Sequence, residues 1–503
     1  MADADFKLSN VQGDILVGLS KKTEVFFFFQ ITNAGAFKSQ LKNVVPLITT
    51  ADKATGEKEA IRAFKAEKQV RINGVNGSSG TNELGEITAN PPLLSVVGVN
   101  IAFSQKGLTA LGVTDDLKDP LFAAGQKADA FDLADKGTGD TKDGFKPDWD
   151  DAFLQEKQEI HGVILVAGDS FETVDGKLDE VKGLLSTDGT SSIAQVATLA
   201  GDVRPGEFKG HEHFGYMDGI SQPALNGVDN VDGKKPFPGQ TLVKLGVGLL
   251  GRDGDDVQGR PGWAKDGSLL AFRKLPQFVP EFDRFLEDTA DKITDFDDFS
   301  DAPSPADILG ARMVGRWKSG APIRITPLVD DPILAADPQR NNKFKFNPKS
   351  QEICPFAAHI RKMNPRKDLA NPETSIDPHL ILRRGIPFGP EVTTEEKLTK
   401  STKYERGLYF VSYQSNLGNG FSFLQRLWAN NQDFPPQEPE QPGFDPIIGQ
   451  VHGEVRAMTG ANDDATANSL PLDRQWVQSK GGEYFFSPSI EALNGALSGG
   501  AQP

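Results

Sequence analysis

The stretch Glu24-Val-Phe-Phe-Phe-Phe-Gln-Ile31 places four consecutive phenylalanines after a valine. Aromatic and β-branched residues are enriched in strands, so this run predicts a strand buried in the core. Further strands are predicted at 93–103, 160–166 and 195–203, with helices at 34–45, 106–111 and 170–185. This order favours a ferredoxin-like α+β unit, in which helices cover one face of an antiparallel sheet.

The second half of the chain predicts the same order of elements without repeating the sequence. Strands are predicted at 268–274, 376–384, 407–413 and 484–486, and helices at 277–288, 305–315 and 421–430. We therefore expect an α+β fold with two ferredoxin-like domains, residues 1–225 and 267–503, joined by a Gly-, Asp- and Pro-rich linker at 226–266. Residues 53–85 and 128–149 are predicted to be irregular and exposed.

The composition of the chain excludes several classes of protein. The chain has 503 residues, a net charge of −16 and 25% charged residues, which is typical of a soluble protein with a large core. The acidic balance disfavours nucleic acid and anionic membranes as partners, and no apolar run approaches the roughly 18 residues of a membrane span. The single cysteine, Cys354, excludes an internal disulfide framework. The first residues lack the basic and apolar regions of a signal peptide.

The stretch Cys354-Pro-Phe-Ala-Ala-His-Ile-Arg-Lys-Met-Asn-Pro-Arg366 sets one histidine among small and apolar residues, next to several cations. Imidazole is the usual protein ligand of haem iron, so His359 is a candidate iron ligand. Cations such as Arg361 and Arg366 suit a group with two carboxylates, as the haem propionates are. A hydrogen-bonded core histidine would give the same local pattern, so this assignment depends on the rest of the site.

A second stretch, Gly210-His-Glu-His-Phe-Gly-Tyr-Met-Asp-Gly-Ile-Ser-Gln-Pro223, holds Asp218 where the chain must turn tightly. Against an apolar pocket this carboxyl group would have a raised pKa and could shuttle protons; an ordinary Asp-Gly turn is the alternative. The spacing of His211 and His213 puts both on one side of a strand. No Cys or second His pair accompanies them, which disfavours a metal site there.

A third stretch, His379-Leu-Ile-Leu-Arg-Arg-Gly-Ile-Pro-Phe-Gly389, ends an apolar strand with Arg383 and Arg384. One guanidinium turned into a cavity could stabilise a developing anion, and the other could bind a haem carboxylate. A pair of surface arginines at the end of a strand is the alternative.

In this order, the three stretches resemble the dye-decolorizing peroxidase (DyP) family in its long fungal form. The resemblance extends over about residues 8–487, and four more stretches match the same pattern. They are Asn10-Val-Gln-Gly-Asp-Ile-Leu16, Phe272-Arg-Lys-Leu-Pro-Gln277, Gly315-Arg-Trp-Lys-Ser-Gly-Ala-Pro322 and Asp445-Pro-Ile-Ile-Gly449. The resemblance implies a haem peroxidase of the dimeric α+β barrel type, whose two ferredoxin-like domains enclose haem b.

By motif position, the resemblance makes His359 the proximal iron ligand, Asp218 the distal acid–base group and Arg383 the distal cation. Arg383 takes this role rather than Arg384 because it stands four residues before Pro387 in the Pro-Phe-Gly turn.

Other roles follow from the same resemblance. Asp445 would accept a hydrogen bond from His359 and raise the basicity of the imidazole. Leu408 and Phe410 would line the distal pocket. The propionate partners would be Arg361, Arg366 and Arg384.

The resemblance also implies the reaction. Hydrogen peroxide would be split at the haem, with Asp218 moving a proton between its oxygens and Arg383 stabilising the separating charge. The resulting ferryl haem would take single electrons from dyes, phenols or other aromatic compounds. For bulky donors Trp428 is a candidate relay, although packing of its helix into the core is equally consistent. Some relatives carry tyrosine at the position of Phe388, and nearby alternatives as relays are Tyr404, Tyr409 and Tyr413.

Two other functions fit parts of the sequence. A haem carrier or haem-iron extraction protein on the same fold would not need both Asp218 and Arg383, and a non-haem adaptor protein would not need His359 either. Acidic runs such as Asp295-Phe-Asp-Asp298 are candidates for binding Mn²⁺, although a solvated surface is their usual meaning. From the resemblance we expect an extracellular protein.

Overall fold

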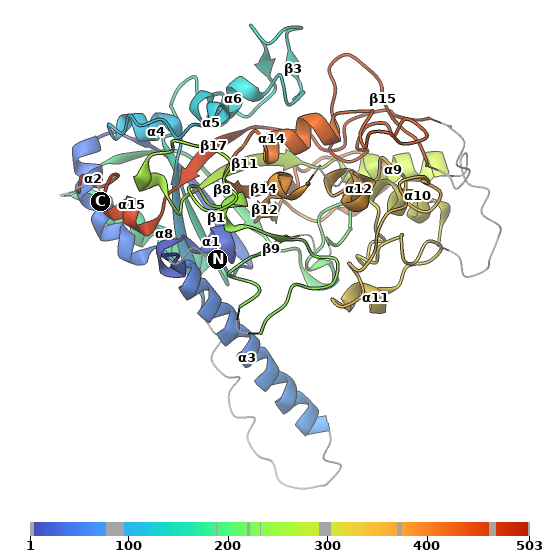
Figure 1. The fold of residues 1–503 in the computed structure, drawn as a ribbon, viewed down its shortest axis with the longest axis horizontal. Helices are drawn as coiled ribbons and strands as arrows, with labels where there is room; N and C mark the ends of the chain where they lie inside the picture. The colour runs from blue at the N-terminus through green and yellow to red at the C-terminus, as the bar shows by residue number, and fades with distance from the viewer. Residues whose placement is uncertain are drawn as a thin grey trace.

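The computed structural model describes residues 5–76, 95–187, 189–218, 222–231, 233–290, 303–369, 375–461 and 469–500. Within these ranges one nine-stranded sheet runs through both halves of the chain (Figure 1). Its strands from the first half are β1 (Thr23–Ile31), β2 (Val97–Phe103), β5 (Gly162–Gly168) and β8 (Ile193–Asp202). Those from the second half are β11 (Ser268–Pro276), β12 (Leu382–Arg383), β13 (Ile386–Phe388), β14 (Gly407–Gln414) and β17 (Gly482–Ser487).

Both halves use the same strand order. The sheet runs β2-β5-β1-β8 in the first half and β12-β14-β11-β17 in the second, so the first strand of each half lies between the third and fourth. Neighbouring strands are antiparallel. This is the ferredoxin-like arrangement, and it confirms the predicted fold class. Strands β17 and β2 pair at Phe486 and Phe103 and join the halves edge to edge.

The inner face of β1 shows that the sheet curls into a barrel. The ring centroids of Phe26 and Phe28 each lie 5.0 Å from that of Phe272 on β11. Tyr409 on β14 lies 5.7 Å from Phe26. Because β17, β2 and β5 separate β11 from β1 along the sheet, these contacts cross the interior of a curled sheet.

Gly201 allows β8 and β13, which do not pair in the sheet, to approach each other where the barrel closes. A Cβ atom on Gly201 of β8 would lie 2.6 Å from Cγ2 of Ile386 and 2.8 Å from the carbonyl oxygen of Pro387. The strands therefore approach each other at this seam more closely than any larger residue allows.

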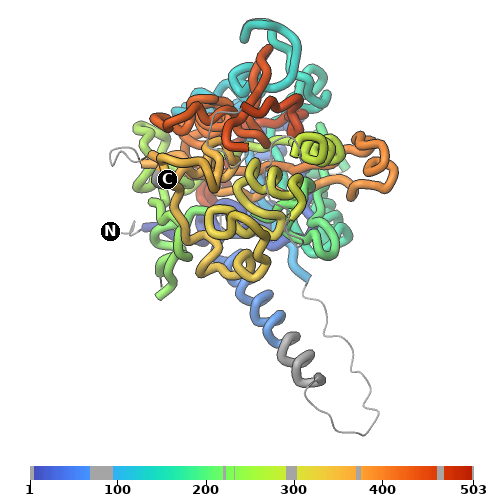
Figure 2. The backbone as a smooth tube through the Cα atoms, turned by 90° about the vertical axis from the view of Figure 1, so that its right-hand side faces the viewer, coloured from blue at the N-terminus to red at the C-terminus, as the bar shows by residue number. Residues whose placement is uncertain are grey.

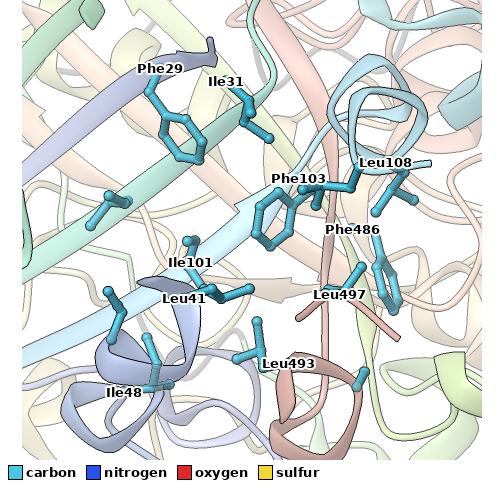
Figure 3. Packing of buried hydrophobic residues seen from close by; sticks show 14 of the residues in the cluster. Phe29, Ile31, Leu41, Ile48, Ile101, Phe103, Leu108, Phe486, Leu493 and Leu497 are labelled. Carbon is cyan, nitrogen blue, oxygen red and sulfur yellow. The ribbon is translucent and has the colours of Figure 1, made fainter. Parts of the chain in front are cut away.

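The outer face of β1 is covered by α2 (Ala34–Val44) and α8 (Phe171–Leu184). Phe29 stacks on Phe37 of α2 with centroids 5.8 Å apart, and both rings meet Phe103 edge-on. Figure 3 shows this cluster continuing to Phe486 and Leu493. Because β1 is buried on both faces, its apolar run is continuous and does not alternate with polar residues.

Helices and long loops of the second half gather on one side of the barrel (Figures 1 and 2). Helices α9 (Val279–Ala290) and α10 (Pro305–Val314) pack against each other, and Trp476 packs against two phenylalanines of α9, Phe282 and Phe285. Helix α12 (His359–Met363) packs against a π-helix at Leu424–Ala429. This layer forms the second wall of the cavity described below.

The remaining elements are short. The helices are α1 (Gly13–Leu16), α4 (Gln105–Ala110), α5 (Pro120–Ala124), α6 (Gln126–Asp129), α7 (Asp151–Leu154), α11 (Pro332–Ala336), α13 (Thr394–Thr399), α14 (Phe421–Phe423) and α15 (Ile490–Asn494). Two-stranded ribbons pair β3 (Gly137–Thr138) with β4 (Lys146–Pro147), β6 (Ser186–Thr187) with β7 (Thr190–Ser191), β9 (Ala224–Leu225) with β10 (Leu242–Val243), and β15 (Arg456–Met458) with β16 (Leu470–Leu472). Within the described ranges, no helix has the length and apolar character needed to cross a membrane.

Three segments correct the sequence-based expectations. Part of the predicted irregular insertion at 53–85 is helical, because α3 (Ala51–Asn76) projects from the body, while 77–85 lie outside the described residues (Figure 1). Alanine, glutamate and lysine are the commonest residues of α3, and their helix propensity outweighs the cost of its two glycines. The predicted exposed loop at 128–149 contains buried Asp135 and Trp149. The strand predicted at 376–384 is shortened to β12 because a 3₁₀ turn occupies Asp377–His379.

The segment predicted as a linker packs against both halves. Leu249, Leu250 and Trp263 are buried, and Arg252 forms an ion pair of 2.5 Å with Asp266. Residues 245–266 thus belong to the packed body of the protein. Division of the chain into domains at 225 and 267 stays a prediction.

The close approach of Gly201 to β13 predicts the effect of adding a side chain at this position. Gly201→Ala should lower Tm, because its methyl group would collide with Ile386 and overpacking costs about 1–3 kcal/mol. Thermal unfolding followed by circular dichroism measures this. The control is Gly176→Ala on α8, where no atom lies within 4 Å of the added Cβ, and it should leave Tm unchanged or raise it. An unchanged Tm for Gly201→Ala would contradict close contact at the seam.

A buried carboxyl group predicts a dependence of stability on pH. Burial raises the pKa of Glu24 from 4.5 to about 7, against the opposing charge of Lys21 at 2.6 Å. Glu24 therefore ionises at lower pH in the unfolded chain than in the folded protein. The folded protein keeps its full stability below pH 4.5 and loses part of it as the pH rises to about 7. Glu24→Gln should make the fall of Tm over this window shallower, whereas exposed Glu172→Gln should not. Parallel Tm curves for wild type and Glu24→Gln would reject the assignment.

Candidate active site

A cavity of about 560 Å³ lies where the barrel wall meets the helices of the second half. Asp218, Arg383 and His359, which come from three distant segments, all line it. The structure thus brings together the three residues on which the sequence-based hypothesis rests. Much of the remaining wall is apolar, and it includes Val314, Ile360, Leu408, Phe410 and Leu424.

His359 begins α12 and has a fixed orientation. Its Nδ1 donates a hydrogen bond of 2.8 Å to Oδ2 of Asp445. The other carboxylate oxygen of Asp445 accepts from the backbone N–H groups of Ile447 and Ile448 at 2.8 and 2.9 Å. Asp445 is fully buried, so these bonds hold its carboxylate in one position.

The charges of this pair reinforce each other. Burial alone would lower the pKa of His359, but the charge of Asp445 and its hydrogen bond outweigh burial and raise that pKa. Burial alone would raise the pKa of Asp445, yet His359 and two backbone N–H groups hold it below its ordinary value. Asp445 is therefore anionic and keeps the proton on Nδ1, which leaves Nε2 as the nitrogen available to a ligand.

Asp218 and Arg383 form the second charged group of the cavity. Arg383 Nη2 lies 2.8 Å from Oδ2 of Asp218, and neither side chain is fully buried by protein. Asp218 comes from the loop before β9, whereas Arg383 lies on β12. A carboxylate and a permanent cation thus share one place in the cavity wall.

Neighbouring side chains hold this loop and strand together. Glu212 is half-buried and accepts hydrogen bonds of 2.8 Å from the N–H groups of Phe214 and Tyr216 in the same loop. Gln222, on the far side of the same loop, accepts from the N–H of Arg383 at 2.8 Å and donates to its carbonyl oxygen at 3.1 Å. Sequence reasoning missed both residues, because amide and carboxylate groups bound to the backbone leave no periodic signal.

Two arginines give the cavity a cationic end. Arg366 and Arg316 line it, and both donate to Oδ1 of Asn342. Burial and the charge of Arg316 lower the pKa of Arg366 to about 10. Two desolvated like charges side by side favour a ligand that carries carboxylates. Arg316 was missed, although the motif Gly315-Arg-Trp-Lys contains it.

The other two predicted propionate partners lie elsewhere. Arg361 is buried and binds Asp368 at 2.6 Å, and it also donates to three backbone carbonyl groups. Arg384 donates to the carbonyl oxygens of Asp14, Ile15 and Leu16 around α1. Neither residue lines the cavity. The expected role does not fit their positions, because both guanidinium groups are bound to protein groups away from the cavity.

Trp428 is buried, with 3% of its surface exposed, and stacks on Phe434 at 4.8 Å. Its ring also meets His379, which lines the cavity, edge-on at 5.6 Å. Among the tyrosines considered as relays, Tyr404 is exposed, whereas Tyr409 and Tyr413 are buried. Packing thus accounts for Trp428, while its role as a relay stays a prediction.

The two histidines near Asp218 do not share one environment. His211 lines the cavity, whereas His213 is buried and donates from Nε2 to the carbonyl oxygen of Phe388 at 2.9 Å. Burial lowers the pKa of His213 to about 4, so it stays neutral. No group of three or more His, Cys, Asp or Glu side chains within the described ranges is placed to hold a metal ion. The acidic run at 295–298 lies outside those ranges.

The donor set fits an iron porphyrin. The cavity offers an oriented imidazole for the metal, apolar walls for the macrocycle and paired arginines for two carboxylates. Asp218 and Arg383 would contribute a carboxylate and a permanent cation to the same cavity.

Comparisons with known proteins agree with this assignment. Residues 10–205 match the DyP dimeric alpha+beta barrel domain, and residues 250–435 match the C-terminal domain of Dyp-type peroxidases. A dye-decolorizing peroxidase of Mycetinis scorodonius is 42% identical over 99% of this chain and 89% of its own length.

Solved structures agree as well. An ancestral D-type dye decolorizing peroxidase has a TM-score of 0.86 at 51% identity, covering 98% of this chain and all of the other. A fungal DyP-type peroxidase from Auricularia auricula-judae has a TM-score of 0.81 at 40% identity, with the same coverage. With the domain matches, these similarities show that the chain belongs to the family of DyP-type peroxidases.

Proposed function

We propose that this protein is a peroxidase that holds haem b in the described cavity and uses hydrogen peroxide to oxidise dyes, phenols and other aromatic compounds. The observation that carries the proposal is the meeting of His359, Asp218 and Arg383 in one cavity. A related dye-decolorizing peroxidase has been solved in complex with 2,6-dimethoxyphenol, which supports aromatic reductants as the substrate class.

His359 and Asp445 would hold the haem iron. Nε2 of His359 would bind iron, and the hydrogen bond from Nδ1 to anionic Asp445 would give the imidazole more electron-donating character. Arg366 and Arg316 would bind the propionates at the cationic end. When bound, haem supplies the electron-transfer chemistry, and the chain orients it and tunes its potential.

Asp218 and Arg383 would act on peroxide. The carboxylate of Asp218 would accept a proton from one peroxide oxygen and return it to the other, so that water can leave. Arg383 would stabilise the negative charge that develops as the O–O bond breaks. Their contact of 2.8 Å places acceptor and cation within reach of one small molecule. A haem carrier needs neither group, which favours the peroxidase over that alternative.

Several finer points stay predictions. They are the oxidation of Mn²⁺, the route of electrons from bulky dyes and secretion from the cell. For dyes, Trp428 contacts His379 in the cavity wall but is buried, so a relay would need a further exposed group such as Tyr404.

Substitutions of His359 and of Asp445 should change the properties of the bound haem in different ways. His359→Ala should abolish the Soret band of ligated haem, because it removes the imidazole that Asp445 orients. Asp445→Asn should retain haem with about tenfold or more loss of affinity and a raised reduction potential, since the imidazole becomes a weaker donor. Haem titration and spectroelectrochemistry measure both effects. Exposed Asp433→Asn is the matched control, and Asp445→Asn values equal to the control would remove Asp445 from this role.

Substitutions on the peroxide side predict slower activation. Asp218→Asn and Arg383→Leu should each reduce the bimolecular rate of reaction with hydrogen peroxide by about 100-fold or more at pH 4, while haem binding is retained. Stopped-flow absorbance of the Soret band measures this rate. Peroxide rates equal to wild type in both variants would remove Asp218 and Arg383 from this role, whereas a wild-type Soret band that does not respond to peroxide would favour a haem carrier over a peroxidase.

A further inference from the structure

A second cavity, of about 300 Å³, lies behind the first. Two segments that are distant in sequence form most of it. They are residues 134–137, before and within β3, and residues 451–453. Gln475 and Gln478 complete the lining. Nothing in the proposed reaction uses this cavity.

Only a thin wall separates the two cavities. Gln450 and Val477 line the large cavity, whereas Val451 and Gln478, their neighbours along the chain, line the small one. Consecutive Cα atoms are about 3.8 Å apart, so at both places the wall is one chain thick.

An ion pair also connects the two cavities. Arg273 lines the large cavity and donates to Oδ1 of Asp135, which lines the small one. The same carboxylate accepts from Nε1 of Trp149 at 3.1 Å. The small cavity is therefore next to the haem site both through the backbone and through a polar bridge.

His452 gives the small cavity an aromatic wall and a proton acceptor. Its ring stacks on Phe131, with centroids 4.6 Å apart and 17° between the planes, and meets Phe145 edge-on at 5.3 Å. Nε2 donates to the carbonyl oxygen of Phe131 at 2.9 Å. The ring is exposed, and with Nε2 as donor its Nδ1 has no hydrogen-bond partner within the described residues, so this nitrogen is open to water or to a ligand.

We infer that this cavity is a second donor site for small phenols, with His452 Nδ1 accepting the phenolic proton. The inference rests on the proposed peroxidase function, which supplies the oxidant. A bound phenol would lose one electron across the thin wall to the peroxide-oxidised enzyme, and its O–H proton would pass to Nδ1 and then to water. Two phenols and one hydrogen peroxide would give two phenoxyl radicals and two waters.

The size and chemistry of the cavity select this substrate class. A volume of about 300 Å³ is at the lower end for ligand pockets, which suits a single ring better than a bulky dye. An unpaired nitrogen beside an aromatic stack suits a planar molecule with one acidic hydroxyl group. Phenols need such an acceptor because removing their electron makes the hydroxyl strongly acidic.

The test compares donors in His452→Phe, which keeps the aromatic stack but removes the nitrogen. Loss of kcat/KM for 2,6-dimethoxyphenol should be about tenfold or more. Rates with tetramethoxybenzene, a single-ring donor without a hydroxyl group, and with a bulky anthraquinone dye should stay within twofold of wild type. Gln475→Trp, which fills the cavity without changing His452, should also lower kcat/KM selectively for 2,6-dimethoxyphenol.

Binding provides a readout independent of turnover. The chain has six histidines, so the ring signals of His452 can be assigned by their loss in His452→Phe. Titration with 2,6-dimethoxyphenol should shift these NMR signals saturably in the wild type and not in Gln475→Trp. Tetramethoxybenzene should shift them less.

The outcomes separate this inference from the proposed function. If wild-type protein oxidises no donor, the peroxidase function fails. If both variants oxidise 2,6-dimethoxyphenol like wild type, or if the His452 signals do not respond to it, the second site is overturned while the peroxidase stands. Equal losses for all three donors would assign His452 to packing only and would likewise overturn the site.

Discussion

Contact between Phe26, Phe28 and Phe272 across the barrel interior is the constraint on which the site depends. The two halves of the chain contribute different parts of the cavity, so their relative position decides whether those parts meet. Edge pairing of β17 with β2 alone would allow the sheet to open. The aromatic interior prevents this, because burying large rings on the inner face requires the sheet to close. Gly201 then allows the last strands to touch.

Buried charge is the second organising feature. Asp445 is buried and Glu212 is half-buried, and backbone N–H groups donate hydrogen bonds to both carboxylates. Such bonds compensate for the loss of water and fix the direction of the side chain. Asp445 orients the imidazole on one side of the cavity, and Glu212 shapes the loop that carries Asp218 on the other. Hydrogen bonds to the backbone thus fix the residues that place the reactive groups.

The same principle explains why some cations fit the site and others do not. Arginine is long and always charged, so its position depends on which anions and carbonyl groups compete for it. Arg361 is captured by Asp368 and Arg384 by the end of α1, whereas Arg366 and Arg316 face the cavity. Arginines that are close together in the sequence therefore have different roles, because Arg361 is structural whereas Arg366 lines the cavity. The residue types around Arg383 and Arg384 do not reveal which guanidinium turns inward, and only the resemblance to a known motif indicated Arg383.

Much of the fold could be read from the sequence because helices and strands depend on local composition and order. The apolar run at 24–31, the repeated order of elements and the three motif stretches predicted the two ferredoxin-like halves and the residues His359, Asp218 and Arg383. Helix α3 was missed because a polar composition was read as irregular, although its alanines, glutamates and lysines favour a helix.

Tertiary structure alone decided which residues meet. The pairing of Arg383 with Asp218, the cationic end at Arg316 and the thin wall beside His452 join residues far apart in sequence, and such contacts are set by how the chain packs, not by local preference.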